Sequence, residues 1–252
     1  MGRSIVFGID GTDPAWWNSA ARDKAYDDAF ANSFVKRICD ASHFSMYERG
    51  PLIHGGNLVG AINRGLIFLQ RELAQDPDLE VLLVGYSRGA AGVVTVAQQL
   101  AKARTPIPVK AIMLFDCVDR CGDIDSLVIS RNVANVIHAR RDPLSSSRET
   151  MGSSGYMFYP DSTRYQEGFF MCTHAGMGGT PWPIGKHGPH DLIFETGFAA
   201  AKLTWAHADR PYPYPEMQDA GTTISYQNDR WVSANKVWPW CKGWLLRQGF
   251  MR

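Results

Sequence analysis

The chain has 252 residues, of which 45% are hydrophobic and 20% are charged, so it can form a substantial core and is too apolar for a disordered protein. Its 26 basic residues nearly balance its 25 acidic residues, which leaves a net charge of +1. This balance excludes a strongly basic nucleic-acid binder, and we predict no nucleic-acid partner.

The N-terminal residues predict a strand rather than a secretion signal. Residues 4–9 are mostly β-branched, aromatic or small and end at Asp10, Gly11 and Thr12, which is typical of a buried strand followed by a tight turn. The apolar stretch is too short for a signal peptide, and no run approaches the roughly 20 residues that span a bilayer. We expect a cytoplasmic protein, or one exported by a signal-independent secretion system.

Helical and strand patterns alternate through the middle of the chain. Residues 56–75 place apolar side chains at helical spacing, and residues 80–85 form a short apolar run typical of a strand buried on both faces. A second helix is predicted over 90–103, and further strands over 109–115 and 132–137. This alternation predicts an α/β fold with a mostly parallel central sheet and helices on both faces.

The C-terminal part is less regular. Residues 142–188 are rich in Ser, Gly, Pro and Tyr and too long for an ordinary connection, so we expect functional loops there. Residues 199–208 predict a helix, residues 211–215 an extended segment, and residues 231–250 carry four of the eight tryptophans. No repeat or Gly/Ser linker divides the chain, so we expect one domain over residues 1–252.

The five cysteines are scattered and odd in number, which favours reduced thiols over a disulfide framework. Cys117 and Cys121 lie closest together, but no second Cys or His pair has the spacing of a zinc finger. We therefore predict no metal site and no cofactor.

Residues 85–89, Gly-Tyr-Ser-Arg-Gly, match the G-x-S-x-G motif. The motif lies between a predicted buried strand and a helix of small residues, which is where a nucleophile elbow forms. Its sharp turn crowds the flanking positions, which explains why both are glycine. We predict Ser87 as nucleophile and the Arg88 amide, at a helix N-terminus, as an oxyanion donor.

A serine nucleophile requires a carboxylate that orients its base. Asp116 directly follows the strand after the elbow helix, so it should lie at the same edge of the sheet as Ser87. Asp119, Asp123 and Asp142 are alternatives. Asp142 is a rival because it follows the next predicted strand.

Five histidines follow Ser87, as the usual chain order for this architecture requires: His138, His174, His187, His190 and His207. His138 is predicted to end a strand. His174 lies in a glycine-rich segment that could bring backbone close to a ligand, and His190 lies in a Gly/Pro loop. From position alone, His174 and His190 are nearly equal candidates for the base.

Four segments carry a family resemblance: G-I-D-G-T at 8–12, G-Y-S-R-G-A at 85–90, F-D-C-V-D at 115–119 and H-A-G-M-G-G at 174–179. The four segments occur in the same order as four motifs of an α/β-hydrolase domain family, and the chain resembles that family. Its members carry F-D-G-T-x-N, G-F-S-R-G-A, W-D-T-V-G and V-H-x-D-V-G-G-G. That family includes phospholipase effectors of type VI secretion systems. The resemblance covers roughly residues 4–180.

The resemblance implies a single α/β-hydrolase domain with Ser87 as nucleophile, Asp116 as acid and His174 as base. It also gives the turn after the first strand a role, with the Gly11 or Thr12 amide as the second oxyanion donor. The expected activity is hydrolysis of carboxylic esters, with lipid or phospholipid acyl esters as the leading substrates and transient contact with a membrane surface. An immunity protein is expected as a partner only if the chain is a secreted effector.

Two departures from the family pattern leave alternatives open. Gly176 stands where the family has Asp, and Cys117 stands where it has Thr, so the support of the base and the acid should differ. A small-ester esterase or thioesterase, or an inert hydrolase-like binding module, remains an alternative. Arg140, Arg141 and Arg148 are expected to form structural ion pairs more readily than to bind an anionic substrate.

Overall fold

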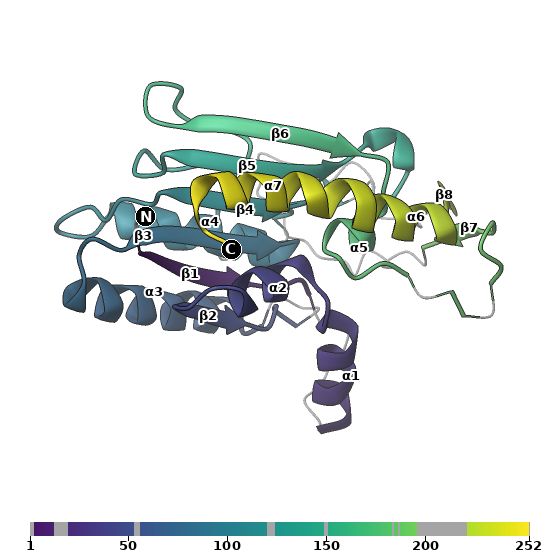
Figure 1. Cartoon of the computed structure of the whole chain (residues 1–252), viewed down its shortest axis with the longest axis horizontal. Coiled ribbons are helices and arrows are strands. Elements are labelled where there is room, and N and C mark those ends of the chain that lie inside the picture. Colours follow the sequence, from purple (N-terminus) through teal and green to yellow (C-terminus); the bar gives the residue numbers. More distant parts are fainter. Residues whose placement is uncertain are drawn as a thin grey trace.

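The computed structural model of the chain describes residues 3–12, 20–52, 56–119, 124–148, 151–182, 184–185, 187–195 and 221–251. Its main sheet has six strands, all parallel, in the order β2-β1-β3-β4-β5-β6 (Figure 1). The strands are β1 (Ser4–Ile9), β2 (Ser45–Glu48), β3 (Glu80–Tyr86), β4 (Ala111–Phe115), β5 (Asn135–Arg141) and β6 (Arg164–Phe170). The predicted α/β class with a mostly parallel central sheet is confirmed.

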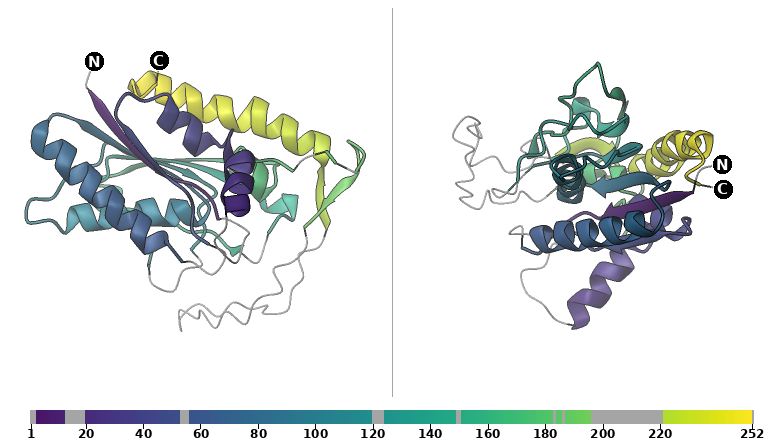
Figure 2. Two further views of the ribbon diagram at one scale, coloured as in Figure 1. Left: turned by 90° about the horizontal axis from the view of Figure 1, so that it is seen from below. Right: turned by 90° about the vertical axis from the view of Figure 1, so that its left-hand side faces the viewer.

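Helices cover both faces of this sheet because its central strands are apolar on both sides. In β3, Val81 and Leu83 pack in one core cluster, whereas Leu82 and Val84 pack in the other. The first cluster includes side chains of two helices, and the second includes, beside those of other elements, side chains of two helices that Figure 2 shows on the opposite side of the sheet. These pairs are α3 (Leu58–Gln75) with α4 (Arg88–Ala101), and α2 (Phe34–Asp40) with α7 (Trp238–Gln248).

The remaining elements gather mainly near the carboxyl ends of the strands (Figure 1). A two-stranded antiparallel sheet pairs β7 with β8, and α6 continues through the π-helical turn η3 into α7. Their bounds are α1 (Ala20–Phe30), η1 (Pro143–Ser145), α5 (His174–Met177), β7 (Leu192–Phe194), β8 (Gly221–Ser225), α6 (Tyr226–Val232) and η3 (Ser233–Val237). No helix in the described ranges is long and apolar enough to cross a membrane.

The predicted elements agree with the structure in the first half of the chain and less well afterwards. The first strand has the predicted bounds, and the elbow strand is one residue longer than predicted. β5 begins three residues later than predicted and continues to Arg141, so His138 lies inside the strand and does not end it. Residues 142–188 hold β6 and α5 as well as loops, and the segments 199–208 and 211–215 lie outside the described residues.

The chain order of the strands reverses beside β1, which lies between β2 and β3. Open parallel sheets bind ligands at the carboxyl ends of their strands next to such a reversal. Along this edge Ile9 is in register with Gly85, and Tyr86 with Phe115. The residues that follow β1, β3 and β4 therefore meet at one place.

Candidate active site

Ser87 forms the sharp turn between β3 and α4. Its backbone has φ 56° and ψ −129°, a conformation that residues other than glycine seldom adopt. The Ser87 amide donates to the Phe115 carbonyl oxygen (3.0 Å), and the Ala90 amide donates to the Ser87 carbonyl oxygen (3.1 Å). The turn is thus held from both sides, in the arrangement of a nucleophile elbow.

The two glycines of the motif are required by close backbone approach. A Cβ atom on Gly85 would lie 2.4 Å from the Ala90 Cα atom, and one on Gly89 would lie 2.2 Å from the Asp10 carbonyl oxygen. Backbone atoms cannot move aside as a flexible side chain can. The crowding predicted from the motif is therefore present, against the elbow helix at one glycine and against the end of β1 at the other.

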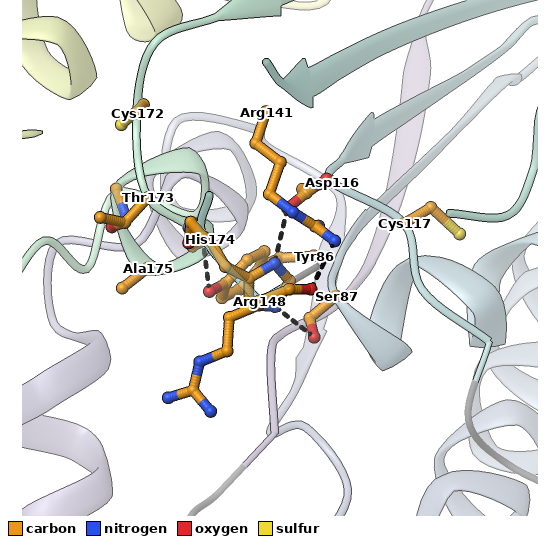
Figure 3. Close-up of polar contacts among 12 residues, drawn as sticks. Tyr86, Ser87, Asp116, Cys117, Arg141, Arg148, Cys172, Thr173, His174 and Ala175 are labelled. Atoms are coloured by element: carbon orange, nitrogen blue, oxygen red, sulfur yellow. Dashed lines mark hydrogen bonds and ion pairs between the residues drawn. The ribbon is translucent and has the colours of Figure 1, made fainter. Parts of the chain in front are cut away.

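The structure brings Ser87, His174 and Asp116 together, and Figure 3 shows the His174 side chain between those of Ser87 and Asp116. His174 Nε2 lies 2.9 Å from Ser87 Oγ, and His174 Nδ1 lies 2.6 Å from Asp116 Oδ2. All three residues are buried. His190, the equal candidate from sequence position, is exposed between α5 and β7.

Asp116 is held by an arginine that the sequence did not link to it. Arg141, at the end of β5, donates from Nη1 to Asp116 Oδ2 (2.5 Å) and from Nη2 to the carbonyl oxygens of Arg148 (2.9 Å) and Gly152 (3.0 Å). Burial acts to raise the pKa of Asp116, but Arg141 and His174 outweigh it, and the net pKa lies well below its ordinary value. The carboxylate stays ionised and can orient Nδ1–H of His174.

The alternative acids have structural roles elsewhere. Asp119 accepts hydrogen bonds from the Ser126 amide (2.9 Å) and hydroxyl (3.0 Å). Asp142 caps the N-terminus of η1 by accepting from the Leu144 amide at 2.9 Å. The third alternative, Asp123, lies outside the described residues.

His138 is a core residue of β5. Its Nε2 accepts a hydrogen bond from the Cys117 amide (3.3 Å), and its Nδ1 lies 2.9 Å from the Tyr165 hydroxyl. Burial lowers the pKa of His138 to about 3, so the ring is neutral at physiological pH. Both ring nitrogens are engaged away from Ser87.

The turn after β1 already engages one of the two expected oxyanion donors. The Gly11 amide donates to its neighbour's carboxylate, Asp10 Oδ1, at 2.8 Å, so this donor has a partner within the chain. Thr12 is the remaining candidate of the two, and its Oγ1 accepts from Arg88 Nε at 2.7 Å, which joins the turn to the elbow helix. Arg88 begins α4, so its backbone amide lies at the N-terminus of the elbow helix.

The Asp10 carboxylate holds this turn by hydrogen bonds. It is fully buried and also accepts from the Ser33 hydroxyl and from the Tyr47 hydroxyl (3.0 Å). Burial raises the pKa of Asp10 to about 7, although these hydrogen bonds oppose the shift. A carboxyl group that titrates near neutral pH therefore lies next to the candidate oxyanion donors.

The three arginines noted in the sequence each pair with a carboxylate of the chain. Arg140 contacts Glu167 at 2.8 Å, Arg141 contacts Asp116, and Arg148 Nε lies 3.6 Å from Glu195. One sequence signal could have indicated the role of Arg141: it is the last residue of β5, and Asp116 directly follows the end of the neighbouring strand β4. Across the described ranges, no three His, Cys, Asp or Glu side chains come together as metal ligands.

No family model matches the chain, and no curated protein sequence does so. Among solved structures it is similar to a cutinase-like protein from Cryptococcus sp., at 17% identity over 66% of this chain and 75% of that one, with a TM-score of 0.32. It is also similar to a protein from Pectobacterium atrosepticum described as a YdeN-like hydrolase (15% identity, 71% and 85% covered, TM-score 0.34). A third is an acetyl xylan esterase (13% identity, 64% and 81% covered, TM-score 0.26). At TM-scores this low, the function proposed below rests on the geometry of the site itself.

Proposed function

We propose that this protein is a serine hydrolase that cleaves carboxylic esters. The observation that carries the proposal is the continuous chain of hydrogen bonds from Ser87 Oγ through both ring nitrogens of His174 to Asp116 Oδ2. A serine hydroxyl is a weak nucleophile at neutral pH, and it becomes effective when a base and a group that orients the base lie in line with it. The elbow backbone at Ser87 supports the same role.

The mechanism follows from this order of groups. Ser87 Oγ attacks the acyl carbon while its proton passes to His174 Nε2, and Asp116 stabilises the imidazolium that forms. Amides of Arg88 and Thr12 hold the oxyanion. His174 then gives its proton to the leaving alcohol. A water molecule attacks the acyl-enzyme by the same steps, which releases the carboxylic acid and restores the Ser87 hydroxyl.

Within this proposal we favour lipid or phospholipid acyl esters as the substrate class. Leu144, Leu192 and Phe194 are exposed by 72%, 60% and 69%, although each is a large apolar side chain. They lie on η1 and β7, and η1 is joined to β8 by a hydrogen bond from Thr223 Oγ1 to the Leu144 carbonyl oxygen (2.8 Å). Exposed apolar side chains on the elements around the site suit transient contact with a lipid surface.

Intact-mass detection of a fluorophosphonate adduct tests the proposed chemistry. We expect one adduct on the wild type and on His190→Ala, none on Ser87→Ala, and strongly slowed labelling of His174→Ala. A wild type that is folded by circular dichroism and forms no adduct would favour an inert binding module instead. Hydrolysis of a short p-nitrophenyl ester, compared with phospholipid vesicles, then separates a small-ester esterase from a lipid hydrolase.

The pH dependence of kcat/KM is expected to show an acid limb with its midpoint below 6.5. Burial lowers the pKa of His174 from its ordinary value of 6.5, although the Asp116 carboxylate opposes the shift. Only the neutral ring accepts the Ser87 proton, so activity is lost as the pH falls through this pKa. Initial rates at low ester concentration measure the limb.

A midpoint above the ordinary histidine value would contradict this expectation, because attraction to Asp116 would then outweigh burial. Asp10, with its pKa raised by burial to about 7, titrates in a neighbouring range. Any second inflection near that pH should therefore disappear in Asp10→Asn, whereas the His174 limb should remain. Circular dichroism at each pH confirms that the protein stays folded.

A further inference from the structure

The segment that carries His174 is held by a buried carboxylate from the C-terminal helices. Asp229 Oδ1 accepts from the Thr173 amide (2.7 Å) and from Cys172 Sγ (3.1 Å), and Oδ2 accepts from Thr173 Oγ1 (2.9 Å). The backbone amide of Trp182, at the other end of the segment, also donates to this carboxylate. Asp229 is fully buried although it belongs to α6. Its carboxylate thus binds both ends of the segment, at Cys172 and Thr173 and at Trp182.

Gly176 provides the space that this carboxylate occupies. A Cβ atom on Gly176 would lie 2.5 Å from Asp229 Oδ1 and 2.3 Å from Cys172 Sγ. A side chain at position 176 and the Asp229 carboxylate therefore exclude each other. The chain lacks a carboxylate on the segment itself and brings one from a distant helix instead.

A second contact from the same helical stretch lies one turn further on. Ser233, which begins the π-helical turn η3, donates from Oγ to the Gly176 carbonyl oxygen at 2.6 Å. A π-helical turn is uncommon and is found often at functional sites. Asp229 and Ser233 thus hold the two ends of the short helix α5.

These contacts reach His174 through its neighbour. Thr173 is the N-cap of α5 and accepts from the Gly176 amide through Oγ1 (3.1 Å), while His174 is the first residue of the helix. The His174 amide donates to Ser147 Oγ (2.8 Å), which fixes the other side of the backbone. The orientation of Thr173 therefore sets the direction in which the imidazole leaves the chain.

We propose that Asp229 is a positioning residue for His174, acting through Thr173 to hold the imidazole in line between Ser87 and Asp116. The proposal rests on the proposed hydrolase function for its kinetic consequence, but the alignment itself is independent of turnover. An alignment error of about 1 Å lowers a catalysed rate by roughly 100-fold without weakening substrate binding. Asp229 should therefore affect kcat and leave KM nearly unchanged.

The test compares Asp229→Asn with Ser225→Ala. Ser225 caps α6 by accepting from the Asn228 amide (3.3 Å) and touches neither His174 nor its segment in the described contacts, so its loss weakens the same helix without releasing the carboxylate. Active sites are counted with a fluorophosphonate, and kcat is expressed per labelled site. We expect Asp229→Asn to lower kcat about 10- to 100-fold with KM within about twofold, and Ser225→Ala to keep both within about twofold.

A readout without turnover separates this proposal from the hydrolase proposal. The His174 Nδ1 proton, hydrogen-bonded to Asp116, should give a downfield proton NMR resonance that is absent in Asp116→Asn. We expect Asp229→Asn to shift or broaden this resonance and Ser225→Ala to leave it unchanged. If the wild type proves inert towards esters and fluorophosphonate, the hydrolase proposal fails and the resonance still tests the positioning role.

Wild-type kcat per site together with an unchanged resonance in Asp229→Asn would overturn the proposal. If that variant does not fold, Thr173→Val takes its place, because it removes the Oγ1 hydrogen bond to Asp229, together with the cap that Oγ1 gives the Gly176 amide, and leaves the carboxylate buried. We expect a smaller loss of kcat, with KM unchanged and the resonance broadened. An unaltered kcat and resonance in this variant would equally overturn the positioning role.

Discussion

Replacing Ser87 or His174 with alanine is expected to lower kcat for ester hydrolysis by about 10⁴- to 10⁶-fold, and replacing both should lower it no further. The two side chains act as one unit, because the proton that leaves Ser87 Oγ must arrive at His174 Nε2, 2.9 Å away. Without His174 the Ser87 hydroxyl has no base to take its proton, and without Ser87 the His174 ring has no nucleophile to activate. Rates with a short p-nitrophenyl ester, measured for the wild type, both single variants and the double variant, give the comparison.

The matched control for this series is His190→Ala, which removes an exposed histidine of the same part of the chain. Its kcat and KM should equal those of the wild type. A large loss in His190→Ala, or an additive loss in the double variant, would contradict the proposed pairing. Circular dichroism and thermal unfolding of each variant establish that the comparison is between folded proteins.

The second large effect is expected for Asp116→Asn, which should lower kcat by about 10⁴-fold. An asparagine at this position can donate to His174 Nδ1 from its amide, which favours the ring tautomer with a proton on Nε2, where the ring cannot accept from Ser87. The variant also leaves Arg141 facing a neutral group at a buried site, so the thermal midpoint should fall as well. Expressing kcat per active site separates the loss of catalysis from the loss of folded protein.

The controls for Asp116 are the two described carboxylates that the sequence offered in its place. Asp119→Asn removes an acceptor of Ser126, and Asp142→Asn removes the cap of η1. Both should retain kcat within about threefold per labelled site, with only modest changes in stability. A loss of kcat in either variant as large as that in Asp116→Asn would mean that the acid has been assigned wrongly.

Local sequence was sufficient where the structure is decided by neighbouring residues. The strand, turn and helix around Ser87 were predicted from a short apolar run, two glycines and a stretch of small residues, and all are present. The edge position of Asp116 followed from the same logic, because parallel strands end on one side of a sheet. Strand ends were less predictable: β5 begins three residues later and ends four residues later than predicted, because pairing with β4 and β6 sets its bounds.

The sequence by itself determined the α/β architecture, the elbow and the side of the sheet on which Asp116 lies, because these depend on patterns within a few residues. Position along the chain left His174 and His190 nearly equal, the family resemblance implied His174, and the tertiary structure brings His174 to Ser87. Only the tertiary structure decided that Arg141 holds Asp116, that the Gly11 amide is already engaged, and that Asp229 occupies the space beside Gly176. Each of these contacts forms only when two atoms approach to hydrogen-bonding or van der Waals distance. Apart from the local contact at Gly11, they join segments far apart in the chain, and their approach follows from the packing of the whole core rather than from any local pattern.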